Sequence, residues 1–351
     1  MITGNGLIDP GKLIKFSAVT FEKLGVPAED ALITAQALVA ADLRGVDSHG
    51  VAHLRPLYIK RIKDGFVNVK PQIKIMSRAA STAVMDGDKG LGFVVGYRAM
   101  EEAISRAEST GSGFVSVRNS THYGAGAYYA MMALKKDMIG ISLTQGGKGI
   151  VAPGSRGRGM GLNVISVAVP AKNEAPFVID MATGVVANGK LEIAARNKQP
   201  IPEGWAVDID NKPVTEVAKA NGGILPLGGS PQLGSYKGFG LTVLVDILCS
   251  TLSGWPTVPE ITQPYTGQAS HFFGAIAVNG FMPAEEFKTR MDAVIKAHHD
   301  LPKAPGIDRI YMSGEIEQEI ENKRKNGLTL HPEIVASLQE LAKELEIAYD
   351  L

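Results

Sequence analysis

Cysteine is almost missing from this chain: Cys249 is the only one in 351 residues. A single cysteine forms neither an internal disulfide nor a thiolate zinc cage, so nothing in the sequence indicates an oxidising compartment. Cys249 lies in the apolar run 241–252, where we expect a buried and unreactive thiol.

An excess of charge of either sign is missing as well, because 36 Lys and Arg residues balance 36 Asp and Glu residues. A neutral chain attracts neither nucleic acid nor an anionic membrane over long range, and we expect neither as a partner. No apolar run reaches the length that spans a bilayer. The first residues lack the basic stretch and apolar core of a signal peptide, and the expected location is the cytoplasm.

The usual phosphate-binding loops are incomplete. The segment closest to G-x-G-x-x-G runs from Gly90 to Gly96 and has one residue too many before its third glycine. Residues 184–190 have the Walker A spacing, but Leu191 stands where Mg²⁺ needs a hydroxyl. We therefore do not expect a kinase or an ATPase. A dinucleotide, if one binds, needs a different cradle.

Metal-binding spacings are also missing. None of the seven histidines lies in an H-E-x-x-H motif or at a His/Cys spacing typical of zinc, so we expect no metal site. His298, His299 and His331 lie in or at the start of amphipathic C-terminal segments, where solvated surface positions are expected.

Glycine, in contrast, is abundant, with 40 residues scattered through the chain against an average use of roughly 7%. This pattern indicates many turns and close backbone approaches in a β-rich core. The length allows a sizeable core and two interleaved domains.

Helical patterns occupy both ends of the chain and strand patterns occupy its middle. Asp9 is a plausible N-cap before Pro10 at the first helical position. Expected helices cover residues 10–24, 27–43, 54–64, 96–109, 128–136, 237–252, 283–301, 314–325 and 332–346; expected strands cover 74–76, 81–86, 114–117, 139–143, 164–169, 177–180 and 271–278; residues 198–234 are expected to form a loop. Such an order predicts an α+β fold rather than a regular βαβ array. It divides the chain into a helical domain, 1–72 with 285–351, and a β-rich region, 73–284.

One cluster of polar residues surrounds Ser48-His49, with Arg44, His53 and Arg55 nearby. Guanidinium groups bind carboxylates in a two-pronged way and an imidazole titrates near neutrality, so this cluster could bind an acid and supply a proton. The alternative is a helix end with a surface histidine.

A second cluster lies at His122, just past a predicted strand and among glycines. The glycines permit a ligand to approach the backbone amides of the following helix, which favours an anion; the alternative is a turn with a backbone-bonded histidine. Asp180, at the end of another strand, could orient a histidine or bind a ribose hydroxyl, or it could cap a turn. Lys237 could meet a phosphate or be solvated.

Six segments in order resemble the malate/L-lactate dehydrogenase-like family of oxidoreductases, which lack the Rossmann fold and include ureidoglycolate, sulfolactate and diketogulonate enzymes and a cyclic imino-acid reductase. The segments are Asp47-Ser-His-Gly-Val51, Asn119-Ser-Thr-His-Tyr-Gly124, Asp180-Met-Ala-Thr183 with Gly189-Lys190, Lys237-Gly238, His271-Phe-Phe273 and Gly314-Glu315.

The resemblance implies an NAD(P)-binding domain on a largely antiparallel or mixed sheet, a helical domain from both termini, and a homodimer with active sites near the subunit interface. It implies that His122 transfers the proton and that Ser48 and His49 share its active site, with His49 as the proton donor in the reductase branch. The expected substrate-binding residues are Arg44, His53, Arg55 and His271. The expected cofactor contacts are His122, Tyr123, Gly124, Ala125, Gly126, Gly146, Asp180, Met181, Ala182, Asn188, Gly189, Lys237, Ser313, Gly314 and Glu315.

Three positions depart from the family pattern. Leu162 replaces a frequent threonine, His53 replaces a frequent arginine, and Lys190 stands where the reductase branch carries an acidic residue. The first two alter the substrate pocket. The third argues against a Ser-His-Asp relay of the reductase kind.

These residues predict an enzyme that transfers a hydride between NAD(P)H and a small 2-oxo or 2-hydroxy acid resembling malate, lactate or ureidoglycolate. His122 is the first candidate for proton transfer and His49 the second. The sequence does not choose between NAD and NADP. Alternatives are a cyclic imino-acid (ketimine) reductase, an NAD(P)-binding sensor without catalysis and, ranked lower, a metal-dependent hydrolase.

Overall fold

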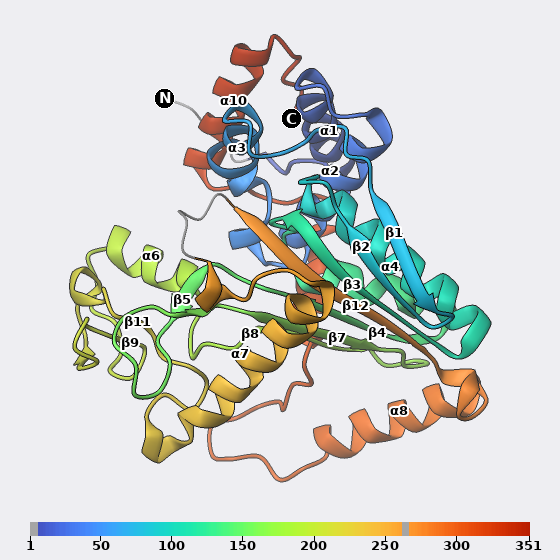
Figure 1. Ribbon diagram of the computed structural model, residues 1–351, viewed down its shortest axis with the longest axis vertical. Coiled ribbons are helices and arrows are strands. Elements are labelled where there is room, and N and C mark those ends of the chain that lie inside the picture. Colours follow the sequence, from blue (N-terminus) through green and yellow to red (C-terminus); the bar gives the residue numbers. More distant parts are fainter. Residues whose placement is uncertain (1–5, 262–266) are drawn as a thin grey trace.

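The centre of the molecule is a seven-stranded sheet in the order β1-β2-β3-β12-β4-β7-β8 (Figure 1). The computed structural model describes residues 6–261 and 267–351, without the side chains of Glu192 and Arg196. In this sheet only β2 and β3 pair in parallel, and every other neighbouring pair is antiparallel. The prediction of an α+β fold on a largely antiparallel sheet is therefore confirmed. The strands are β1 (Lys74–Ala79), β2 (Thr82–Asp86), β3 (Ser112–Thr121), β4 (Met138–Thr144), β7 (Val164–Val169), β8 (Phe177–Ala182) and β12 (Gln268–Ala277).

Alternation along β12 divides the two faces of this sheet. Phe273 packs in a cluster with α4 (Gly92–Thr110), whereas its neighbour Phe272 packs with Val245 and Cys249 of α7 (Ser235–Cys249). Successive side chains of a strand point to opposite faces, so α4 and α7 cover opposite sides. Cys249 is fully buried, as expected for an unreactive thiol.

A second, smaller sheet lies beside the first in the order β10-β9-β11-β5-β6 (Figure 1). Its strands have two or three residues each, too few to produce a periodic pattern. The prediction of a plain loop over 198–234 was therefore wrong, and the nine-residue helix α6 was missed. The elements are β5 (Lys148–Ile150), β6 (Met160–Gly161), β9 (Ala206–Val207), β10 (Pro213–Val214), β11 (Gly223–Ile224) and α6 (Asn188–Arg196).

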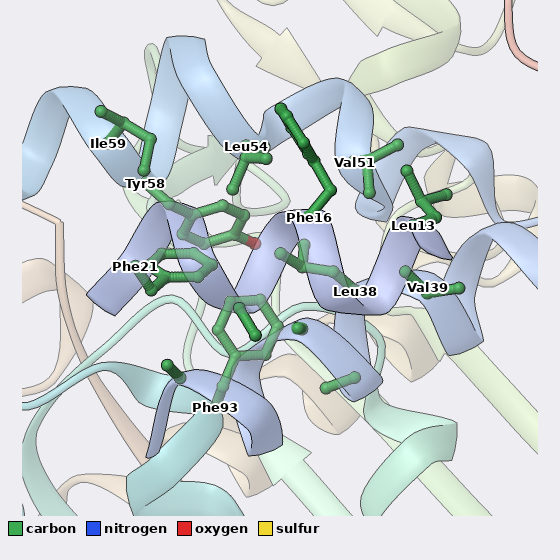
Figure 2. Close-up of a cluster of buried hydrophobic side chains, with 14 of the residues drawn as sticks. Leu13, Phe16, Phe21, Leu38, Val39, Val51, Leu54, Tyr58, Ile59 and Phe93 are labelled. Carbon is green, nitrogen blue, oxygen red and sulfur yellow. The ribbon is translucent and has the colours of Figure 1, made fainter. Parts of the chain in front are cut away.

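Helices from the two ends of the chain pack together in one apolar cluster (Figures 1 and 2). Asp9 caps the first helix by accepting a hydrogen bond from the Lys12 amide at 2.9 Å, so the N-cap prediction is confirmed. Leu338 and Leu341, near the C-terminus, belong to the same cluster as Leu13 and Leu38. The helices are α1 (Pro10–Lys23), α2 (Ala28–Leu43), α3 (Lys60–Lys63) and α10 (Pro332–Leu345). Helix α9 (Glu315–Arg324) contacts α2 without contributing side chains to this cluster.

Helix α8 (Ala284–His299) lies away from this terminal cluster, on the side of α7 (Figure 1). Only Ala284 and Ile295 of α8 are buried. The helices at the two ends of the chain therefore do not all pack in one cluster. The division into two domains stays a prediction. None of the helices in the described ranges is long and apolar enough to cross a membrane.

The segment between α2 and the end of α3 contains several kinds of helix, whereas the sequence predicted a single α-helix over 54–64. Two short 3-10 turns, Asp47–His49 and Val51–His53, lead into a π-helix, Leu54–Ile59, before α3. The helix α5 (Gly126–Ala130) likewise starts two residues earlier than predicted and continues as a 3-10 helix to Lys136.

Candidate functional site

His122 directly follows Thr121, the last residue of β3, and Gly90 and Gly92 pack against this end of the strand. The Thr121 hydroxyl donates to the Gly90 carbonyl at 3.0 Å and accepts from the Gly92 amide at 2.9 Å. A Cβ atom on Gly92 would lie 2.1 Å from the Thr121 carbonyl oxygen. The glycine segment that resembles an incomplete dinucleotide loop therefore lets α4 begin against the backbone that carries His122.

Three histidines, His49, His53 and His122, form a cluster at this strand end. The rings of His49 and His122 are stacked, with centroids 5.9 Å apart and planes at 18°. His53 meets His49 edge-on at 6.3 Å. The Ser48 hydroxyl lies 2.9 Å from His49 Nδ1. The fold thus brings together the Ser48-His49 and His122 segments, which the sequence singled out separately.

Tyr58, which the sequence reasoning missed, reaches the cluster from the π-helix. Its hydroxyl lies 2.8 Å from His122 Nδ1, and the Gly124 amide donates to the same nitrogen at 3.3 Å. The sequence places Tyr58 only within the helix expected over 54–64, and no local signal links it to His122.

The electrostatics of the cluster favour neutral rings. Burial lowers the pKa of His122 well below its usual value, and the neighbouring His49 adds to this effect. Burial also lowers the pKa of His49 to about 4, with His53 as the second cause. Both imidazoles are therefore uncharged at neutral pH and able to accept a proton.

Arg61 is a second residue that the sequence reasoning missed. Its positive charge lowers the pKa of both His122 and Tyr58, and a Cβ atom on Gly267 would come within 2.5 Å of the Arg61 guanidinium carbon. In the sequence, Lys60-Arg61-Ile-Lys63 has the appearance of a solvated basic run.

The two arginines predicted to bind substrate pair with acidic residues of other helices. Arg44 forms an ion pair with Glu321 of α9 at 2.8 Å, and Arg55 pairs with Glu340 and Glu344 of α10. Both link the turns after α2 to C-terminal helices. Their role in substrate binding stays a prediction.

His271, also predicted to contact substrate, is fully buried in the sheet. Its Nδ1 lies 2.7 Å from the Thr144 hydroxyl and its Nε2 lies 2.9 Å from the Ser120 hydroxyl. Its ring stacks on Tyr123 with centroids 4.6 Å apart. Burial lowers the pKa of His271 to about 3. Both nitrogens of His271 are thus hydrogen-bonded, and its ring packs against Tyr123, the residue that follows His122.

A cavity of about 620 Å³ is lined by Ala125, in the segment that follows His122, together with Asp180, Gly314 and Arg44. Its lining does not include His49, His53 or His122. Its size suits a bound small molecule or part of a dinucleotide. Apolar and aromatic side chains wall it and suit a nucleotide base. Its charged lining is mixed, with Arg44, Lys135 and Lys136 against Glu101, Glu108, Asp180, Glu317 and Glu321, so the residues present fit a base and its ribose hydroxyls better than phosphates. The apolar and aromatic walls are Tyr97, Ile104, Tyr128, Met131 and Met132.

Asp180 connects this cavity to α5. Its carboxylate accepts from the Ala127 amide at 2.9 Å, and a Cβ atom on Gly126 would come within 3.1 Å of it. The crowded recess desolvates the carboxylate and raises the pKa of Asp180 to about 6, although the residue keeps an exposed surface. Asp180 therefore caps α5 and faces the cavity.

The other predicted cofactor contacts lie around the same region without lining this cavity. Gly189, at the start of α6, is near Ser48, since a Cβ atom there would lie 3.7 Å from the Ser48 Cβ. The Gly146 amide donates to Asn163 at 2.9 Å, and the Ser313 carbonyl accepts from the Val178 amide at 2.9 Å. The remaining positions are exposed or half-buried: Met181, Ala182, Asn188 and Lys237.

Glu315 is buried and holds the chain before α9. Its carboxylate accepts from the Met312 amide at 2.9 Å and lies 2.8 Å from His299 and 3.1 Å from Arg309. His299 is therefore half-buried beside a carboxylate, and its prediction as a solvated residue was wrong. Leu162, the position of the missing threonine, packs against the apolar cluster of the smaller sheet.

Within the described ranges, no group of three or more His, Cys, Asp or Glu residues is arranged to hold a metal ion. The histidines of the cluster contact one another through their rings and form hydrogen bonds with hydroxyl and amide groups.

Comparison with known proteins gives a consistent result along the whole chain. The family model described as malate/L-lactate dehydrogenase matches residues 8–339. A malate dehydrogenase of Pyrococcus horikoshii is 43% identical over 96% of this chain and 94% of that protein. An L-sulfolactate dehydrogenase of Methanocaldococcus jannaschii is 39% identical over 97% of each. The crystal structure of malate dehydrogenase from Entamoeba histolytica superposes with a TM-score of 0.94 at 31% identity, covering 99% of both chains.

Proposed function

Because the chain belongs to the malate/L-lactate dehydrogenase family, we propose that it transfers a hydride between a nicotinamide cofactor and a small 2-oxo or 2-hydroxy acid. The observation that carries this proposal is the stacking of His49 on His122, at the start of the segment whose Ala125 lines a cavity of nucleotide size. Such a site combines a proton-exchanging group with room for a cofactor.

The residues that would hold the cofactor are those lining the cavity at Ala125, Asp180 and Gly314. When bound, NAD or NADP supplies or takes up the hydride. Asp180 offers its carboxylate to a hydroxyl group, as expected for a ribose contact. The aromatic and apolar wall opposite would exclude water from a bound base.

Proton exchange is assigned to His122. Since its ring is uncharged at neutral pH, it can accept the hydroxyl proton of a 2-hydroxy acid and return it in the reverse direction. His49, stacked on it and bonded to Ser48, is the second candidate.

Cationic groups near His122 would hold the substrate carboxylate. Arg61 carries a permanent charge close enough to lower the pKa of His122, and His53 lies beside His49. Malate and sulfolactate, the substrates in the names of the relatives, are both 2-hydroxy acids with a second acidic group. The permanent charge of Arg61 and an imidazole at His53 that can donate a hydrogen bond suit a substrate of this kind, and we place it before lactate and ureidoglycolate.

We also propose that two copies of the chain associate. Helix α7 exposes Leu241, Leu244 and Ile247 at helical spacing. A cluster of exposed apolar side chains is typical of an interaction surface.

The proposal is tested by following the loss of NADH or NADPH absorbance with a panel of acids. We expect turnover with oxaloacetate or sulfopyruvate above that with pyruvate, and none with a cyclic imino acid. Turnover of the imine alone would establish the ketimine reductase instead. Binding of NADH and NADPH without turnover of any compound would indicate a sensor.

Variants in the same assay separate the proposed roles. His122→Gln is expected to lower kcat by on the order of 10²-fold or more, because proton transfer loses its carrier. Arg61→Gln should raise the KM for the acid more than Arg55→Gln does, since Arg55 is paired with α10. The reverse order would return the carboxylate-binding role to Arg55.

A further inference from the structure

Tyr58 occupies an unusual place in the chain. It lies in the π-helix Leu54–Ile59, a widened winding that is rare and is frequent at functional sites. Its ring packs on Phe93 with centroids 4.9 Å apart inside the apolar cluster, where Figure 2 shows it. Only 2% of the residue is exposed.

The hydroxyl at the end of this buried ring needs a hydrogen bond partner, because an unpaired buried hydroxyl is costly. In the described part of the chain its hydrogen bond is to His122 Nδ1, at 2.8 Å. The backbone that carries Tyr58 and the backbone that carries His122 are thus joined through two side chains.

The two nitrogens of His122 have different surroundings. Nδ1 meets the Tyr58 hydroxyl and the Gly124 amide, whereas no hydrogen bond to Nε2 is present among the residues described. The Gly124 N–H can only donate, so it bonds Nδ1 only while that nitrogen carries no proton. A hydroxyl both donates and accepts, so Tyr58 can stay bonded whether Nδ1 is bare or protonated.

We propose that Tyr58 is a positioning residue, whose hydroxyl holds Nδ1 of His122 in both charge states and thereby leaves Nε2 to exchange the substrate proton. In the neutral ring that accepts a proton at Nε2, Nδ1–H donates to the Tyr58 oxygen, and the longer contact from the Gly124 amide is given up. In the imidazolium formed, the same bond persists. The inference rests on the proposed role of His122 in the reaction.

Tyr58 acts through His122 and not as an acid or base itself. Burial raises the pKa of the Tyr58 phenol, and the charge of Arg61 opposes this only in part, so the hydroxyl keeps its proton. The titratable groups that face His122 are His49, His53, Arg61 and His271. All four disfavour the imidazolium, and a neutral oxygen acceptor at Nδ1 is therefore the group that favours it.

The first test is Tyr58→Phe, which keeps the ring and removes the oxygen. We expect kcat to fall on the order of 10–100-fold, as for other groups that orient a reacting residue, with a nearly unchanged KM for the cofactor. The pKa that limits reduction should move to lower pH, because the imidazolium loses its acceptor. An unchanged kcat and pH profile would overturn the inference.

The second test reads the His122 ring directly and does not depend on activity. In protein with ¹⁵N-labelled histidine, the Nδ1 resonance of His122, assigned with His122→Gln, should move in Tyr58→Phe and its tautomer ratio should change. Tyr129→Phe is the matched control, because it also removes a buried hydroxyl, one that donates to the Tyr123 carbonyl at 2.6 Å. It should leave the ratio at His122 unchanged.

The outcomes separate the two proposals. If no acid in the panel is turned over but the His122 resonance moves in Tyr58→Phe, the proposed function fails and the contact stands. If the resonance is the same in wild type and Tyr58→Phe, the positioning role is overturned whatever the activity. Should Tyr58→Phe not fold, Tyr58→Met provides a flexible apolar replacement for the same measurement.

Discussion

Burial decides what each histidine of this protein can do. His271 has hydroxyl partners at both nitrogens and no exposed surface. His122, a short distance away in the fold, has partners at Nδ1 and is half-buried. The same side chain is therefore a packing element in one position and available for chemistry in the other.

His271 should make stability depend on pH. Burial lowers its pKa from 6.5 to about 3, so the folded chain binds fewer protons there than the unfolded chain between these values. Neutral His271 makes its full contribution to the free energy of unfolding above pH 6.5, and this contribution is lost as pH falls toward 3. The loss between pH 7 and pH 4.5 is roughly 2–3 kcal/mol. Urea unfolding of wild type and His271→Asn at both pH values measures it.

We expect His271→Asn to be less stable at pH 7 but to lose less on acidification than wild type. The comparison with the variant is needed because Asp42 and Asp180 act in the opposite direction. Burial raises the pKa of Asp42 to about 7 and of Asp180 to about 6, so they reduce stability as pH rises through 4–7. Equal pH slopes in the two proteins would contradict the assignment.

Among the elements, the turn after α2 depends on one glycine. The Asp42 carboxylate, buried at the end of α2, accepts from the Val51 amide at 2.9 Å. A Cβ atom on Gly50 would lie 1.9 Å from an oxygen of this carboxylate. No other residue type fits between α2 and the His49 turn without displacing one of them.

Gly50→Ala is therefore expected to destabilise the protein by roughly 1–3 kcal/mol, the usual cost of overpacking, and to reduce turnover by moving His49. Denaturant unfolding and the acid reduction assay measure the two effects. Gly280→Ala is the matched control, because Gly280 ends the 3-10 helix Val278–Gly280 with open space where a Cβ atom would lie. It should be neutral or stabilising by up to about 1 kcal/mol, and a similar loss in both variants would refute the steric explanation.

For the whole molecule, the exposed face of α7 is the feature that a single chain leaves unexplained. Ile247 on α7 and Ile75 on the edge strand β1 are both 47% exposed. Leu244 is exposed on the same helix, one turn from Ile247, whereas Met76, also exposed, points to the opposite face of β1 from Ile75. Burying such a cluster against a second copy would remove it from water.

We expect sedimentation equilibrium to give the mass of a dimer for wild type and Ile75→Glu. Ile247→Glu should shift the equilibrium toward the monomer, because a charge would have to be buried at the interface. A monomer for wild type, or the same dimer for all three proteins, would remove α7 from the interface.

The sequence by itself determined features that depend on neighbours along the chain. Asp9 before Pro10 marked the first helix, and the apolar pattern of 164–169 gave β7 with its observed bounds. The ordered motifs gave the family and singled out Ser48, His49 and His122. Strands of two residues were not found, because they are too short to show a period, and the nine-residue helix α6 was missed as well.

Only the tertiary structure decided which of these residues meet. The sheet order places β12 between β3 and β4, and the stacking of His49 on His122 joins the end of β3 to the turn after α2. Tyr58 and Arg61 also reach His122 through contacts between distant segments. Arg44 and Arg55 instead form ion pairs with helices α9 and α10. A local pattern reports which face of an element is buried, but a contact between distant segments depends on how the whole core packs.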